Sequence, residues 1–199
     1  MIAGELPIEI LIGQKVRTYV NTKINNSDYD APLEVRYWRH PADLVTIHEV
    51  KIGTIYTTEV YMDGSKIGDK VGAAGIVFEN GNIVHQMQFK LHGHCTNNQA
   101  EQIAILKTLE KLQELQAGQN VIYAKQVALY TDSKITLDLL QNQSKRNLLI
   151  GSIRNKIKAL EQLRCITHFG WIKGHAGIEG NEMLDKLAKE AALKKGPIA

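Results

Sequence analysis

The sequence has little of what marks several large protein classes. It contains two cysteines, Cys95 and Cys165, too few for a disulfide framework, and only four prolines in 199 residues. No apolar run approaches the roughly 20 residues that a membrane-spanning helix needs. The opening stretch MIAGELPIEILIG carries an acid and a proline, so it does not resemble a signal peptide. We therefore expect neither a disulfide-rich nor a membrane protein, and a reducing intracellular compartment.

The composition is that of an ordinary globular protein. Hydrophobic residues make up 44% of the chain, charged residues 23% and aromatic residues 6%. The length suits one domain of about 150 residues with an appendage. The formal net charge of +3 permits a polyanionic partner without requiring one.

Residues 1–56 differ in pattern from the rest of the chain. Pro7 precedes apolar residues at helical spacing, which predicts one amphipathic helix. A polar, turn-rich stretch, NTKINNSDYDAP, and the aperiodic stretch EVRYWRHP follow. We interpret residues 1–56 as a helix and an irregular connector, and residues 57–199 as the main domain.

From Tyr56 onward the pattern is regular. It predicts strands over residues 57–62, 71–78 and 83–91, a turn at Asp63-Gly64-Ser65, and a hairpin turn at Asn80-Gly81. Helices are predicted over 98–116, 133–141 and 148–163 and after Gly180, with further strands over 126–131 and 165–172. This order predicts an α/β fold whose five-stranded mixed sheet, three antiparallel strands and then two parallel ones, is flanked by helices.

Four acids stand where predicted elements begin or end. Asp63 and Asp132 follow strands, Glu101 lies in the first turn of the long helix, and Asp185 lies early in the last helix. In α/β sheets, ligands collect near the carboxyl ends of strands, so these side chains are candidates to meet at one point.

Each acid also has a local explanation. Asp63 fits a turn, and Asp132 could cap the helix that starts at Ser133. Glu101 could close a capping box with Asn98, and Asp185 could pair with Lys189 one helical turn later. The four positions therefore have to be judged together.

Taken together, four sequence blocks resemble the signature of the ribonuclease H family. The blocks are YMDGSK, TNNQAE, YTDSK and GHAGIEGNEMLDKLAKEA, in that order, within residues 57–195. The chain is most similar to type 1-like domains from non-LTR retrotransposon polyproteins. The resemblance implies a ribonuclease H-like fold and an endoribonuclease that hydrolyses the RNA strand of RNA/DNA hybrids.

The resemblance also implies a two-metal site. Asp63 would bridge two Mg²⁺ ions, Asp185 would share the ion that holds the attacking water, and Glu101 and Asp132 would complete the other; Mn²⁺ is a possible substitute. Four acids without cations would repel one another and raise some of their pKa values. His175, in the glycine-rich loop 174–180, would assist proton transfer or product release.

Substrate contacts follow from the same resemblance. Recognition of the ribose 2′-OH in the minor groove would fall to residues after Asp63 and at the start of the long helix, although the latter could equally be helix caps. The expected substrate-binding residues are Gly64, Ser65, Lys66, Thr96, Asn97, Asn98 and Ser133.

His92, His94 and Cys95 also suggest zinc, but no second ligand pair follows at finger spacing, so no zinc site is predicted.

The resemblance extends to context. Residues 1–56 resemble the connector after a reverse transcriptase, which would then lie in cis, and nuclear localisation would follow. Bacterial relatives carry a tryptophan-rich basic protrusion after the TDS block. Here that region has no tryptophan, and positive charge is provided there by Lys145, Arg146, Arg154, Lys156 and Lys158. We expect weak hybrid affinity in isolation, offset by tethering.

Two other functions stay open at this stage. The chain could be a catalytically inactive nucleic-acid-binding or spacer domain of a polymerase polyprotein, although such copies would be expected to lose acids. It could also be a DNA-cutting nuclease of the same fold.

Overall fold

The computed structural model of the chain describes residues 45–118, 125–142, 147–174 and 179–194. The chain divides into two compact units, residues 1–41 and 42–199, and the described residues all lie in the second. The helix predicted after Pro7 and the stretch EVRYWRHP lie outside them. No helix in these ranges is both long and apolar enough to cross a bilayer.

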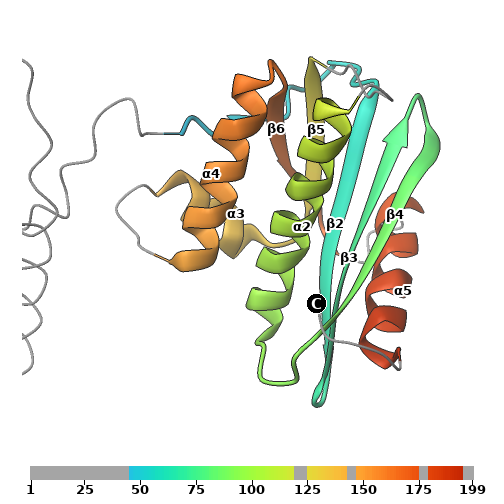
Figure 1. Cartoon of the computed structure of the whole chain (residues 1–199). Helices are drawn as coiled ribbons and strands as arrows, with labels where there is room; N and C mark the ends of the chain where they lie inside the picture. Colours follow the sequence, from blue (N-terminus) through green and yellow to red (C-terminus); the bar gives the residue numbers. More distant parts are fainter. Residues whose placement is uncertain (1–44, 119–124, 143–146, 175–178, 195–199) are drawn as a thin grey trace, which may run out of the picture. The chain divides into compact units, whose positions relative to one another are not determined.

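One mixed sheet of six strands forms the centre of the described unit, in the order β1-β6-β5-β2-β3-β4 (Figure 1). Strands β2, β3 and β4 are antiparallel neighbours, whereas β5 is parallel to β2, β6 to β5 and β1 to β6. The strands are β1 (His48–Glu49), β2 (Thr58–Ile67), β3 (Lys70–Glu79), β4 (Asn82–Leu91), β5 (Gln126–Thr131) and β6 (Ile166–Trp171). The predicted mixed α/β architecture is confirmed.

The predicted count of five strands was one too low. The additional strand, β1, has only two residues and lies in a stretch without alternation, so no periodic signal could reveal it. Its place comes from its partner instead: His48 pairs with His168 and Glu49 with Phe169 at the β6 edge.

Helices cover both faces of the sheet (Figure 1). Helices α2 (Asn97–Ala117), α3 (Lys134–Gln141) and α4 (Leu148–Gln162) pack on one face, and α5 (Glu179–Leu193) packs on the other. The main core joins Val60 and Met62 of β2 to the apolar stripe of α2, and the second core joins Ala74 and Ile76 of β3 to Leu184 of α5. Within β3, for example, Ala73 belongs to the main core and its neighbour Ala74 to the second core, because successive residues of a strand point to opposite faces of the sheet.

One of the two predicted turns is confirmed and the other is wrong. Asn80 (φ 51°) and Gly81 (φ 76°) both adopt the left-handed conformation of a tight hairpin turn. In contrast, β2 runs straight through Asp63-Gly64-Ser65, and the chain reverses at Gly68 (φ 63°) and Asp69. Gly64 is needed for another reason: a Cβ there would lie 2.3 Å from the backbone nitrogen of Glu101.

Residues just before β2 also belong to this unit. The Val50 N–H donates to the carbonyl of Phe169, and the ring of Tyr56 lies 5.3 Å from that of His168. Val45 and Tyr56 are both buried. The end of the segment interpreted as a connector thus packs on β6, while the proposed division at residue 56 stays a prediction.

Candidate active site

Strand register places two of the four acids side by side. Strands β2 and β5 are parallel, with Tyr61 opposite Tyr130, and Asp63 and Asp132 each follow two residues later. Neighbouring strands lie about 4.8 Å apart, and residues two apart share a face. The rings of Tyr61 and Tyr130 stack at 5.0 Å on that face. Both carboxylates therefore emerge at one level of the sheet, beyond this aromatic pair.

A close approach between β2 and α2 brings in Glu101. Because Gly64 has no side chain, the strand backbone lies directly against the backbone of Ala100 and Glu101. Asn97 Nδ2 donates to Glu101 Oε1 at 2.7 Å, which orients the carboxylate. The contact thus places Glu101 beside Gly64, the residue that follows Asp63.

The capping box predicted for Asn98 and Glu101 was wrong. Thr96 is the N-cap: its hydroxyl accepts from the Gln99 N–H at 3.2 Å, and its own N–H donates to Gln99 Oε1 at 2.8 Å. Since α2 begins at Asn97, Glu101 lies beyond the first turn and takes no part in capping. The local explanation for Glu101 therefore falls away.

Asp185 comes from the opposite face of the sheet, on α5. Gly72 lets this helix approach β3 so closely that a Cβ would lie 2.4 Å from the carbonyl oxygen of Ala188. The predicted local pair is present, since Lys189 Nζ donates to Asp185 Oδ2 at 2.6 Å. The pair does not remove Asp185 from the cluster, because its charge also acts on Asp63.

The electrostatics couple Asp63 to the other three acids. The pKa of Asp63 is raised from 3.8 to about 7, first by burial and then by the charges of Asp132 and Asp185, with a smaller contribution from Glu101. The N–H of Gly64 partly offsets these effects. The pKa of Glu101 is also raised, mainly by burial and further by Asp132, while a hydrogen bond with Ser133 lowers it. The structure therefore brings together acids that lie up to 122 positions apart in the sequence.

The donor set suits a hard divalent cation. Carboxylate oxygens are the ligands that Mg²⁺ and Mn²⁺ prefer, and positive charge would relieve the repulsion that raises the pKa of Asp63. Among the described residues, no three His, Cys, Asp or Glu side chains already form a group that could hold a metal ion. The Asp185 carboxylate in particular is turned to Lys189. Ion binding would therefore require these side chains to reorient toward one another.

The residues after Asp63 differ in their accessibility. Gly64 and Ser65 are buried, so only Lys66 of this predicted substrate-binding group is exposed. Lys66 Nζ donates to the carbonyls of Gly93 and Cys95, at 3.1 and 2.7 Å, and so fastens the β2 strand to the connection before α2.

The start of α2 presents three predicted contact residues. Thr96 is the cap, Asn97 binds Glu101, and Asn98 is exposed. Ser133 is buried, lies at the N-cap position of α3 and shares a 2.7 Å hydrogen bond with the Thr136 hydroxyl. Its bond with Glu101 makes Ser133 a support of the acid cluster.

His175 and Gly177 lie outside the described residues. The glycine before His175 is described, and it lies against the cluster: a Cβ at Gly174 would be 2.8 Å from Asp132 Oδ2. At the other end of the loop, a Cβ at Gly180 would be 3.1 Å from the ring of Tyr61. Both ends of the predicted helper loop thus pack on residues of the site.

Two further predictions concerned charge and metal. Arg154 is buried rather than part of a basic surface, because it donates to the carbonyls of Leu139, Leu140 and Asn142 at the end of α3.

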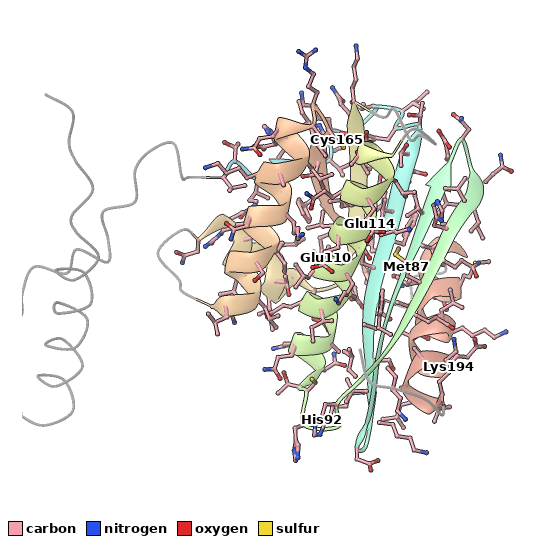
Figure 2. The ribbon with its side chains drawn as sticks, in the orientation of Figure 1. Met87, His92, Glu110, Glu114, Cys165 and Lys194 are labelled. Atoms are coloured by element: carbon pink, nitrogen blue, oxygen red, sulfur yellow. The ribbon has the colours of Figure 1, made fainter. Side chains whose placement is uncertain are left out.

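The rings of His92 and His94 stack with their centres 4.8 Å apart, and no metal-binding group of three forms there among the described residues. Figure 2 places His92 at the connection between β4 and α2, at the opposite end of the domain from Cys165.

One residue at the site had no sequence signal. Trp171, the last residue of β6, donates its indole N–H to the carbonyl of Asp132 at 3.0 Å. A tryptophan at the end of a strand indicates only β propensity and burial. Register was needed to reveal the contact, because Trp171 pairs with Thr131, the residue before Asp132.

Comparison with solved structures supports the fold. The N-terminal RNase H domain of Rv2228c from Mycobacterium tuberculosis superposes with a TM-score of 0.53, at 19% identity over 69% of this chain and 94% of that one. LC11-RNase H1, solved in complex with an RNA/DNA hybrid, gives a TM-score of 0.54 at 23% identity, covering 68% and 96%.

Sequence comparison identifies the family. The sequence model for RNase H matches residues 56–193, and the chain therefore belongs to the RNase H family. Among relatives, ribonuclease H of Saccharomyces cerevisiae is 27% identical over 74% of this chain and 50% of its own length. Ribonuclease H of Idiomarina loihiensis is 32% identical over 70% of this chain and 90% of its own.

A viral polyprotein also matches. The Pol polyprotein of caprine arthritis encephalitis virus is 30% identical over 75% of this chain but only 12% of its own length. The chain thus spans half of the yeast enzyme and about an eighth of the viral polyprotein.

Proposed function

We propose that this protein is a metal-dependent endoribonuclease that hydrolyses the RNA strand of RNA/DNA hybrids. The observation that supports the proposal is the electrostatic coupling of Asp63 with Asp132, Asp185 and Glu101, which adds to the effect of burial in raising the pKa of Asp63. Family membership supports the same activity, and a relative in this fold has been solved with an RNA/DNA hybrid. The pairing of Asp185 with Lys189 does not explain why Asp63 is held near the charges of three other acids.

The proposed cofactor is a pair of Mg²⁺ ions, with Mn²⁺ as a substitute. When bound, such ions neutralise the phosphate, activate a water and stabilise the departing 3′ oxygen. The chain's own residues would prepare the site. Asp63 supplies a half-buried carboxylate with a raised pKa, Asn97 and Ser133 orient Glu101, and Lys189 holds Asp185 until a cation competes for it.

His175 and the predicted contact residues complete the proposal. An imidazole next to the cluster would move protons between the reacting groups and solvent, an accelerating role of about 10²- to 10⁴-fold. Of the residues predicted to read the hybrid, those exposed enough to meet it are Lys66, Thr96, Asn97 and Asn98. Gly64, Ser65 and Ser133 are buried and would act by shaping the site.

A cleavage assay tests the function directly. A fluorescently labelled RNA/DNA hybrid is incubated with the full chain and Mg²⁺, with duplex DNA and duplex RNA as parallel substrates. We expect cleavage of the hybrid's RNA strand alone and none by Asp63→Asn. Cleavage of duplex DNA would favour a DNA-cutting nuclease of this fold, and no cleavage of any substrate would favour an inactive binding or spacer domain.

The polyprotein match favours a particular biological setting. We infer that the domain acts during reverse transcription of a retrotransposon, with a reverse transcriptase domain in cis and, for a non-LTR element, in the nucleus. The absence of tryptophan between Asp132 and Arg154 is consistent with a domain that borrows affinity from a tethered partner. Binding of the isolated chain to a hybrid at physiological salt tests this, and nanomolar affinity would contradict it.

A further inference from the structure

The peptide of Asp132 lies where the chain leaves β5 and enters α3. The last ladder pair between β5 and β6 joins Thr131 to Trp171, and the Ile172 N–H donates to the carbonyl of Thr131. Asp132 is the residue that directly follows β5. Its carbonyl accepts from the Lys134 N–H and from the Trp171 indole N–H, both at 3.0 Å.

The indole is placed where packing alone would not require it. Trp171 is 53% exposed, whereas its neighbour Phe169 on the same strand is 4% exposed and belongs to the main core. The ring forms one wall of a pocket of about 400 Å³, together with Tyr130 and Lys134, and so has open space beside it. The hydrogen bond to Asp132 is thus a specific polar contact of a half-exposed side chain.

The carboxylate of the same residue is confined from another direction. Gly174, three residues after Trp171, approaches so closely that a Cβ would lie 2.8 Å from Asp132 Oδ2. The last residue of β6 and the segment after it thus approach Asp132 at two places, the carbonyl through Trp171 and the carboxylate through Gly174. Rotation of the Asp132 peptide would disturb both contacts together.

We propose that Trp171 is a positioning residue for Asp132: its indole N–H fixes the peptide at the end of β5, and the Asp132 carboxylate is thereby held toward Asp63. This inference rests on the proposed metal site. Loss of groups that orient metal ligands commonly weakens metal binding by about 10- to 100-fold, and a bond to the ligand's backbone falls at the lower end of that range.

The variant Trp171→Phe separates the hydrogen bond from the ring, because it keeps an aromatic side chain and removes the N–H. We expect calorimetric titration of the full-length chain with Mn²⁺, in the absence of nucleic acid, to show about tenfold weaker binding. In cleavage assays the Mg²⁺ concentration for half-maximal rate should rise by a similar factor, with the KM for hybrid changing less than about twofold.

The matched control is Phe169→Leu, which loosens the buried packing of β6 without touching Asp132. We expect it to lower the melting temperature and to leave Mn²⁺ affinity within about twofold. If Trp171→Phe binds Mn²⁺ as tightly as the parent chain, or if both variants weaken binding in proportion to their loss of stability, the positioning role is wrong. A parent chain that binds Mn²⁺ but leaves hybrids uncut would refute the proposed function and still allow this comparison.

Discussion

Replacing Asp63 with asparagine should stabilise the metal-free protein at alkaline pH while abolishing cleavage. The folded state raises the pKa of Asp63 from 3.8 to about 7, so between these values the folded protein binds a proton that the unfolded chain does not. Stability from this group is therefore complete below about pH 4 and is lost as pH rises through 7. At pH 8 the parent chain carries a buried, repelled carboxylate, and Asp63→Asn removes that charge at nearly constant volume.

The size of the effect follows from the pKa difference. A change from 3.8 to about 7 corresponds to at most roughly 4 kcal/mol. Salt and relaxation of the neighbouring acids reduce this, and the asparagine does not fully replace the bond with Gly64. We expect a net gain of about 2 kcal/mol in the free energy of unfolding at pH 8 and little gain at pH 4.

Urea denaturation of both proteins at pH 4, 6 and 8, with EDTA present, measures this difference. Asp69→Asn is the matched control, because it removes the same charge from an exposed turn and should change stability by less than about 0.5 kcal/mol. Added Mg²⁺ should stabilise the parent chain and not Asp63→Asn. A variant that is less stable than the parent at pH 8, or whose difference does not vary with pH, would refute the electrostatic reasoning.

Three substitutions test the contacts that build the site. Gly64→Ala should destabilise the fold by about 3 kcal/mol or more in urea titration, because its Cβ would overlap the backbone of α2; a loss below 1 kcal/mol would contradict the close approach. Thr96→Ala should cost about 1 kcal/mol by removing the helix cap, whereas the same change at Thr46, which is exposed, should cost little. Arg154→Met should lower the melting temperature by several degrees, since three carbonyls lose their buried donor, and an unchanged transition would count against that role.

Regular elements were predictable because their signals are local. The strand β5 begins and ends where the short run QVALYT predicts, and the Asn80-Gly81 hairpin follows from the preference of both residues for positive φ. Helix α4 ends within one residue of its predicted limit because its apolar residues recur at helical spacing. In each case the period or turn is contained in the residues themselves.

The errors have one physical origin: at these positions the structure is decided by contacts between residues far apart in the sequence. Gly64 was interpreted as a turn residue, but its small size serves the approach of α2, a helix that begins 33 positions later. Strand β1 exists only because the β6 edge accepts it. The acids could be nominated from sequence, yet their meeting depends on the β2–β5 register and two close backbone approaches.

The docking of β1 has a practical consequence for anyone preparing this domain. The RNase H match begins at residue 56, yet a fragment cut there would lack the strand that covers the β6 edge and the His48 ring that lies 5.5 Å from that of His168. An uncovered edge invites pairing with another molecule, so such a fragment should aggregate on concentration. Expression boundaries for this protein belong ahead of Val45, not at the edge of the conserved-family match.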